Sequence, residues 1–194
     1  MREVLTRQKV IEAAEEVFRR FGPEKTNVVD VARELGVSHG SVYRHFASKA
    51  EVRDAVVEGW LRRTSEPLGK IAESAEPPVA RLRHWFDALR AAKSRKVLTD
   101  PEMFRVSREI FAEVREVVKD HVDHLVAQLE RIIGDGVAAG VFRAEDPHAA
   151  AQALFDATAR FHDPAHAQEW VDPGTDAAFE RVFQLLLAGL TKGI

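Results

Sequence analysis

The stretch from residue 28 to residue 49, VVDVARELGVSHGSVYRHFASK, constrains this chain more than any other. Apolar residues recur at helical spacing in its first half, which predicts a short helix. Gly36 is placed to end that helix, because glycine adopts the left-handed conformation without a steric penalty. Ser38 can cap a second helix, on which Val42 and Phe46 stand four residues apart and face inward. Two short helices joined by a tight turn are typical of a helix-turn-helix.

The outward side of the second helix is polar, which suits contact with DNA better than burial in a core. Arg44 can donate two hydrogen bonds to guanine O6 and N7 in the major groove. Gly40 lets the backbone approach a base edge or a phosphate closely. A short polar surface helix in an unrelated helical protein is the alternative interpretation, because generic helix-turn-helix patterns also match such helices. The residues expected to contact DNA are Ser38, His39, Gly40, Ser41, Tyr43, Arg44, His45 and Lys49.

Residues 5–53 resemble the DNA-binding domain of the tetracycline-repressor (TetR-like) family of bacterial transcription regulators. The resemblance implies that the Thr26 hydroxyl also faces a DNA phosphate. At Ala50 the chain departs from the family, which more usually has an acidic residue directly after the lysine. The residues that carry the resemblance are Ile11, Ala13, Ala14, Phe18, Phe21, Gly22, Thr26, Val29, Asp30, Val31, Ala32, Gly36, Val37, Ser38, Gly40, Val42, Tyr43, His45, Phe46, Ser48 and Lys49.

The resemblance implies an all-α fold with two domains: an N-terminal three-helix helix-turn-helix domain at residues 1–48 and a C-terminal helical ligand-binding and dimerisation domain at residues 49–194. A packing helix is expected over residues 3–21. A fourth helix is expected to start after Ser48 and to break or kink at Thr64–Pro67, because proline cannot donate an intrahelical hydrogen bond. Four Asp-Pro pairs mark further expected helix starts, since aspartate caps a helix and proline favours its first turn. These pairs begin at Asp100, Asp146, Asp163 and Asp172.

The charge is distributed unevenly between the predicted domains. The whole chain has a formal net charge of −3, whereas residues 1–53 hold ten basic and eight acidic residues. A weakly basic head predicts weak binding to random DNA, since phosphate neutralisation supplies most non-specific affinity. The chain contains no cysteine, which excludes disulfides, thiolate metal sites and cysteine nucleophiles. No apolar run reaches the length of a membrane span and the first residues lack signal-peptide character, so we expect a cytoplasmic protein. We assign no cofactor.

The last two long helices expected from the sequence cover residues 147–161 and about 174–190, with small and apolar residues at helical spacing. The resemblance implies that they pair with the same helices of a second subunit as a four-helix bundle. A homodimer would suit a near-palindromic operator, because one twofold axis then relates the two subunits and also the two half-sites of the DNA. Burial of these residues within one subunit is the alternative. The residues assigned to the interface are Ala150, Ala153, Leu154, Ala157, Phe161, Phe179, Val182, Phe183, Leu186 and Leu190.

A pocket for a small-molecule effector is also implied by the resemblance. Core packing is the more common role for its candidate residues, because aromatic residues on an amphipathic helix usually pack in the core. His162 and His166 are four residues apart and could hold zinc together with Asp163. No third ligand stands at a recognisable spacing, so no metal site is assigned. The candidate pocket residues are Trp60, Trp85, Phe86, Phe104, Phe111, His121, Leu125, Phe155 and His162.

Together these patterns predict a homodimeric, sequence-specific repressor that binds double-stranded DNA and is released from a palindromic operator by a small apolar or amphipathic ligand. One alternative is a transcriptional activator or a DNA binder that does not respond to a ligand. Another is an all-α enzyme that uses histidines and carboxylates for acid–base chemistry. The chain offers no activated nucleophile, phosphate loop or complete metal set, which disfavours an enzyme.

Overall fold

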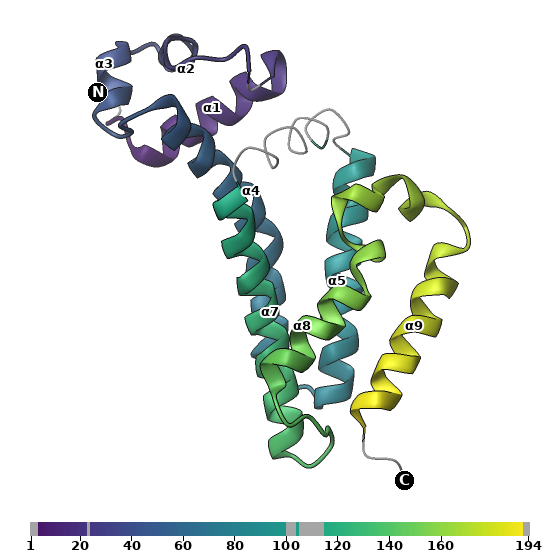
Figure 1. Cartoon of the computed structure of the whole chain (residues 1–194). Helices are drawn as coiled ribbons and strands as arrows, with labels where there is room; N and C mark the ends of the chain where they lie inside the picture. Colours follow the sequence, from purple (N-terminus) through teal and green to yellow (C-terminus); the bar gives the residue numbers. More distant parts are fainter. Residues whose placement is uncertain (1–3, 23, 100–103, 105–114, 192–194) are drawn as a thin grey trace. The chain divides into compact units, whose positions relative to one another are not determined.

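The computed structural model describes residues 4–22, 24–99, 104 and 115–191 (Figure 1). Over these residues the chain forms helices without a named strand, which confirms the predicted all-α fold. None of the described helices combines the length and the apolar character needed to cross a lipid bilayer. The helices are α1 (Arg7–Phe21), α2 (Val28–Glu34), α3 (His39–Tyr43), α4 (Lys49–Ala72), α5 (Pro78–Thr99), α7 (Arg115–Ala138), α8 (Pro147–Ala157), α9 (Thr175–Leu190) and the 3₁₀ helices η1 (Ala159–Phe161) and η2 (Pro164–Val171).

The chain divides into two compact units. The first comprises Met1–Arg62 and Asp100–Lys119, and the second comprises Arg63–Thr99 and Asp120–Ile194. The first unit therefore continues beyond residue 48, after which the sequence analysis placed the domain boundary.

The start of α4 explains this difference. Val52, Val56 and Trp60 lie on one face of α4 and are buried in the hydrophobic core of the first unit. The second half of α4 contributes Leu68 to the core of the second unit. The helix does not end at the expected break, because α4 continues through Pro67.

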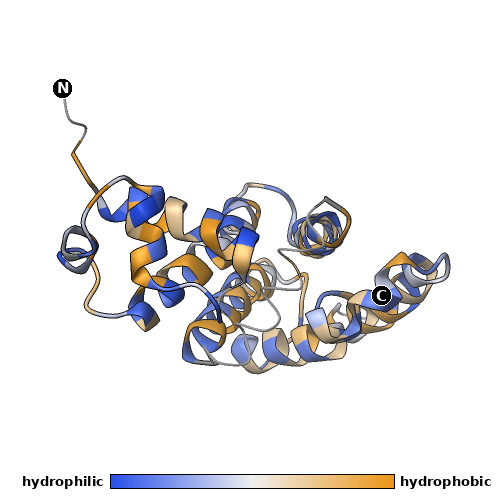
Figure 2. Ribbon diagram, turned by 90° about the horizontal axis from the view of Figure 1, so that it is seen from above, coloured by the Kyte–Doolittle hydropathy of each residue, from blue (hydrophilic) through white to orange (hydrophobic). Residues whose placement is uncertain are grey.

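The core of the first unit is built on α1. Ala14 and Phe18 are buried on its inner face, and Figure 2 shows the hydrophobic and hydrophilic residues that alternate along the helices. Thr6 caps the start of α1 by accepting a hydrogen bond from the Lys9 N–H at 3.3 Å. Gly22 ends it with φ +78°, and its N–H donates to the Phe18 carbonyl at 2.9 Å. Local capping thus sets the length of a helix that packing holds in place.

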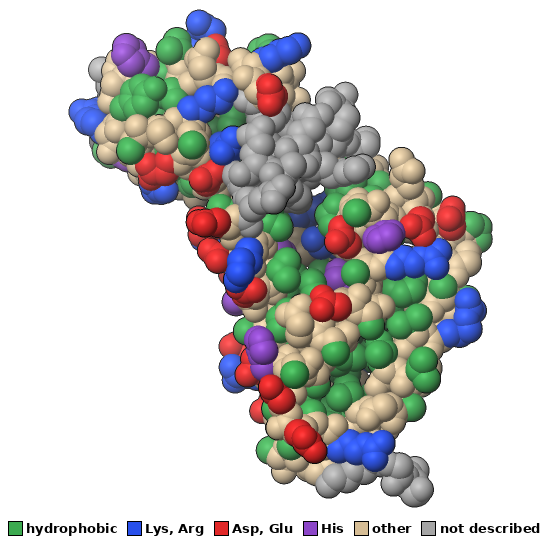
Figure 3. Space-filling model, in the orientation of Figure 1, with side chains coloured by type: hydrophobic (Ala, Val, Ile, Leu, Met, Phe, Trp, Pro, Cys, Tyr) green, Lys and Arg blue, Asp and Glu red, His purple; other side chains and the backbone are tan. Residues whose placement is uncertain are grey.

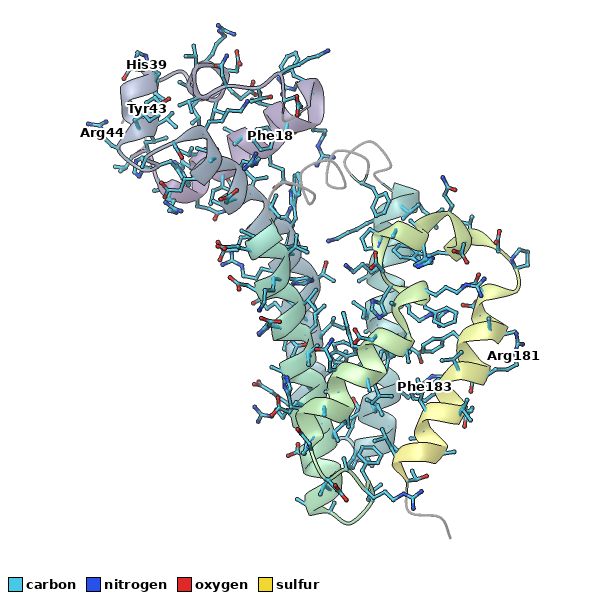
Figure 4. The ribbon with its side chains drawn as sticks, in the orientation of Figure 1. Phe18, His39, Tyr43, Arg44, Arg181 and Phe183 are labelled. Atoms are coloured by element: carbon cyan, nitrogen blue, oxygen red, sulfur yellow. The ribbon has the colours of Figure 1, made fainter. Side chains whose placement is uncertain are left out.

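A second, aromatic core lies between α5 and α9. Phe86 meets Phe183 edge-on, with ring centroids 6.0 Å apart. The Arg90 guanidinium lies 4.0 Å from the centroid of the Phe179 ring, a cation–π contact. Figure 4 shows Phe183 pointing into this core and Arg181 pointing away from it. The two helices are therefore joined by aromatic contacts, and Arg90 of α5 covers the face of one of these rings.

The Asp-Pro pairs start helices where the structure describes them, with one difference. The carboxylates of Asp146 and Asp163 accept backbone N–H bonds at the starts of α8 and η2, as predicted. Asp172 precedes α9 without capping it, because Gly174 occupies the N-cap position. The pair at Asp100 lies outside the described residues.

Gly136 on α7 allows a close approach that a larger residue would prevent. A Cβ atom there would lie 2.0 Å from Cδ2 of Phe142, a buried ring. We expect Gly136→Ala to lower the free energy of unfolding by about 1–3 kcal/mol, because the ring must move within a packed core. Gly134→Ala is the control: a Cβ there meets nothing within 4 Å, so helix propensity should raise that free energy by about 1 kcal/mol. Urea unfolding of both variants measures the difference, and equal stabilities would contradict the close approach.

Candidate nucleic-acid interface and the polar interior of the second unit

The helix-turn-helix is shaped by local hydrogen bonds. Asn27 and Asp30 form a capping box at the start of α2, with side chain to N–H distances of 3.1 and 3.0 Å. Gly36 follows α2 with φ +64°, the left-handed conformation expected from the sequence. Ser38 Oγ then accepts a hydrogen bond from the Ser41 N–H at 3.2 Å and starts α3. These contacts confirm the predicted helix-turn-helix.

Two buried side chains orient α3. Val42 and Phe46 are at most 1% exposed, which confirms that they face inward. His39, Tyr43 and Arg44 are exposed, and Figure 4 shows them on the outer side of the first unit. The apolar anchors thus force the polar residues of α3 to face away from the core.

A short series of hydrogen bonds runs along this outer side. The hydroxyl oxygens of Ser38 and Ser41 are 2.9 Å apart, and Arg44 Nη2 donates to Ser41 Oγ at 3.3 Å. Gly40 is exposed, whereas Ser41 and His45 are half-buried. This bond occupies one N–H of the Arg44 guanidinium, which carries five, so further donors remain for a base edge.

Two residues predicted to contact phosphate are used within the first unit. Thr26 is buried, and its hydroxyl donates to the Gly22 carbonyl at 2.7 Å. The Lys49 ammonium donates to the Glu24 carbonyl at 3.1 Å while the residue remains exposed. We therefore leave Thr26 out of the candidate surface and retain Lys49.

Arg7 has a positioning role that the sequence analysis did not identify. Its Nη1 donates to the His45 carbonyl at 2.9 Å and to Glu51 Oε1 at 3.0 Å. Its guanidinium also lies 4.0 Å from the centroid of the Phe46 ring. The Ala47 N–H and Arg7 both donate to the Glu51 carboxylate and lower its pKa. Arg7 thereby ties α1 to the segment that follows α3; a basic residue in the first turn of a helix is too common a signal to reveal this.

The residues predicted to line an effector pocket do not all lie together. Trp60 belongs to the core of the first unit. Phe104 is half-buried in that unit, and Phe111 lies outside the described residues. The remaining candidates are buried in the second unit: Trp85, Phe86, His121, Leu125, Phe155 and His162. A depression of about 470 Å³ elsewhere in that unit is lined by none of them but by Val137, Phe142, Arg143, Ala144 and Glu145.

The two buried histidines have strongly lowered pKa values. His121 is 9% exposed, and burial, followed by the charges of Lys93, Lys96 and His124, lowers its pKa to about 3. Burial, followed by the charge of Lys93, lowers the pKa of His162 to about 4. Both imidazoles are therefore neutral near pH 7.

The sequence analysis overlooked Lys93. Burial lowers the pKa of its ammonium to about 8, although the residue as a whole is only half-buried. A signal was present, because the apolar stripe of α5 that includes Phe86 and Leu89 continues at helical spacing to Lys93 and Lys96. Lysines that continue an apolar stripe are expected to turn partly into the interior.

The histidine pair considered for zinc has other partners. His162 Nε2 lies 3.2 Å from both the Thr158 hydroxyl and the Phe155 carbonyl. His166 Nδ1 pairs with Glu169 at 2.8 Å. Among the residues that the structure describes, no group of three or more potential ligands could hold a metal ion.

The residues assigned to a dimer interface fall into two sets. One set packs in the core of the single chain: Leu154, Phe161, Phe179, Phe183 and Leu190. Ala153 and Ala157 are exposed, whereas Ala150, Val182 and Leu186 are half-buried. Leu185, which the sequence analysis did not select, is 75% exposed. Figure 3 shows hydrophobic side chains gathered around α8 and α9 of the second unit.

Two family models match this chain. The family described as "Bacterial regulatory proteins, tetR family" matches residues 10–56. The family described as "Tetracyclin repressor-like, C-terminal domain" matches residues 78–183, which is more than half of the chain.

Individual proteins with known names are also similar. The HTH-type transcriptional regulator TtgR of Pseudomonas putida is 38% identical over 71 residues, a match that covers 37% of this chain and only 33% of TtgR. The HTH-type transcriptional repressor KstR2 of Mycobacterium tuberculosis is 26% identical over 96% of this chain and 93% of its own length.

A solved structure shares the fold. SmeT, the repressor of the Stenotrophomonas maltophilia multidrug efflux pump SmeDEF, is 23% identical, with a TM-score of 0.66 over 97% of this chain and 91% of SmeT. A complex of SmeT with triclosan gives a TM-score of 0.68 at 21% identity, over 96% of this chain and 91% of that one.

The burial of His121 predicts a specific acid sensitivity. Because its pKa is about 3 in the folded chain and 6.5 ordinarily, the unfolded chain binds more protons between these values. Acid should therefore reduce the free energy of unfolding below about pH 6.5, by up to about 1.4 kcal/mol per pH unit for this group. In His121→Phe, the slope should be smaller and the stability at pH 7 equal or higher, since an unsatisfied buried imidazole is replaced by an apolar ring. Urea unfolding from pH 7 to pH 4.5 measures this, and parallel curves would refute it.

Proposed function

The chain belongs to the tetR family of bacterial regulatory proteins, and we propose that it is a homodimeric, sequence-specific repressor released from a near-palindromic operator by a small-molecule effector. The observation that carries the proposal is the exposed polar side of α3, with Tyr43 and Arg44 outward and Val42 and Phe46 buried behind them. The two named relatives are transcriptional regulators, which supports a regulator over an enzyme.

We assign base recognition to α3. Arg44 would donate to a guanine in the major groove, and the Ser41 hydroxyl beside it could meet another base edge. Exposed Tyr43, His39 and Lys49 would contact phosphates and set the register on the duplex. Arg7 would hold the segment after α3 in place, because its Nη1 donates to the His45 carbonyl and to Glu51.

Dimerisation would use the outer side of α8 and α9. Leu185 exposes 75% of its surface, and small exposed residues such as Ala153 and Ala157 allow another helix to approach closely. An exposed apolar face with a self-complementary shape suits a twofold interface. The buried aromatic residues of α9 would then support the interface from behind.

Release would be transmitted through α4 and α7, because each of these helices runs through both units. A ligand that binds one arrangement of the second unit more tightly shifts the population toward it. A preference of a few kcal/mol is enough to empty the operator.

Selection of bound sequences from a random DNA pool tests the proposal. A twofold-symmetric motif is expected, and absence of enrichment by a folded dimer would refute it. The purified operator then separates the alternatives, since DNA binding that no ligand changes would favour a ligand-independent regulator. Transcription from an operator-bearing promoter distinguishes repression from activation.

Arg44→Ala should reduce affinity for the selected operator by about 1–3 kcal/mol and relax the preference at one base pair in each half-site. Folding should be unaffected because Arg44 is exposed. Arg33→Ala is the matched control: Arg33 is an exposed arginine of α2 that pairs with Asp30 at 3.1 Å. Fluorescence anisotropy with the operator and single-base variants measures both, and an unchanged base preference in Arg44→Ala would refute the assignment.

Leu185→Glu should convert the dimer to a monomer at micromolar concentration, because the new charge would be desolvated in the interface. Leu98 on α5 is similarly exposed, at 69%, so Leu98→Glu should leave the dimer intact. Analytical ultracentrifugation compares the two variants. A dimeric Leu185→Glu protein would show that the interface lies elsewhere.

A further inference from the structure

The second unit contains a buried histidine with an unsatisfied ring nitrogen and a lysine whose charge acts on that ring. His121 is 9% exposed, and its Nε2 has no hydrogen-bond partner. The charge of Lys93 lowers the pKa of both His121 and His162, so this ammonium acts electrostatically on both rings. Among the described residues Lys93 forms no salt bridge. The charge of the Asp163 carboxylate raises the pKa of Lys93 but does not offset the effect of burial.

Gln128, seven residues beyond His121 on α7, has hydrogen-bond partners for its side chain. Gln128 accepts a hydrogen bond from Trp85 Nε1 at 2.9 Å. The Gln128 amide donates to the Ser65 carbonyl at 3.0 Å and lies 3.0 Å from His124 Nε2. The unmet hydrogen-bonding capacity at this place therefore belongs to the His121 imidazole.

Such an arrangement is costly without a further partner. The nearby Lys96 has one, since its ammonium donates to the Thr64 hydroxyl at 2.6 Å. A buried polar atom with no hydrogen bond loses its hydration without compensation, and a desolvated ammonium without an ion pair loses more. A bound anion would compensate both Lys93 and His121, since it accepts a hydrogen bond from the imidazole and neutralises the ammonium.

We propose that Lys93 and His121 bind the carboxylate of a monoanionic organic effector. One carboxylate oxygen would accept a hydrogen bond from His121 Nε2–H of the neutral imidazole, and the other would pair with the Lys93 ammonium. A cationic ligand would be repelled by Lys93 and Lys96, and a neutral ligand would leave the ammonium without a counter-ion. This inference rests on the proposed function, because it names the chemical class of the effector.

Direct titration of the purified protein tests the site without DNA. Octanoate is the probe, and 1-octanol and octylamine are matched neutral and cationic controls with the same carbon chain. Isothermal titration calorimetry at pH 7 should give octanoate at least tenfold higher affinity than either control. Equal affinity for octanoate and 1-octanol, or no octanoate binding, would overturn the proposal.

Variants separate recognition from stability. Lys93→Gln and His121→Phe should each weaken octanoate binding tenfold or more, and Lys70→Gln, which removes an exposed lysine of the same unit, should not. His121→Phe is expected to be at least as stable as the parent, so loss of binding in that variant cannot be attributed to unfolding. Unchanged octanoate affinity in both site variants would refute the assignment.

The operator complex distinguishes this proposal from the proposed function. Octanoate that binds but leaves the protein on its operator would retain the carboxylate site and reject effector-driven release. A protein that binds no operator but discriminates octanoate from 1-octanol would retain the carboxylate site and reject the proposed DNA-binding function.

Discussion

Helix α4 buries apolar side chains in two separate hydrophobic cores, and the rest of the structure depends on this. Val56 and Trp60 lie in the core of the first unit and Leu68 in that of the second. Pro67 removes one backbone donor from the helix, yet α4 continues to Ala72. Packing on both sides of the proline compensates for that loss, because apolar residues are buried before it and after it.

The outward polar surface of α3 follows from the burial of two apolar side chains behind it. Val42 and Phe46 are buried, so the polar residues between them must face outward. Arg7 secures the end of this segment through the His45 carbonyl and Glu51. A helix of this length has little stability by itself, and its orientation therefore depends on these tertiary contacts.

The second unit combines an apolar core with buried polar side chains, among which the lysine ammonium of Lys93 is desolvated. Gln128 is fully hydrogen-bonded, whereas His121 is not. Proteins seldom retain a buried unsatisfied group without a functional reason, because each one reduces stability. The charge of Lys93 acts on this histidine, and the two residues together motivate the proposed anion site.

The sequence by itself determined the helix-turn-helix and its capping residues, because capping bonds join residues close in the chain. It also placed helix starts at Asp146 and Asp163 for the same reason. It also determined the inward-facing pair Val42 and Phe46, because helical spacing shows which side of the helix is apolar. Only the tertiary structure decided that Thr26 is buried, that α4 belongs to both units, and that the charge of Lys93 acts on His121. These features depend on contacts between distant segments, and helical periodicity shows which side of a helix is apolar but not what packs against it.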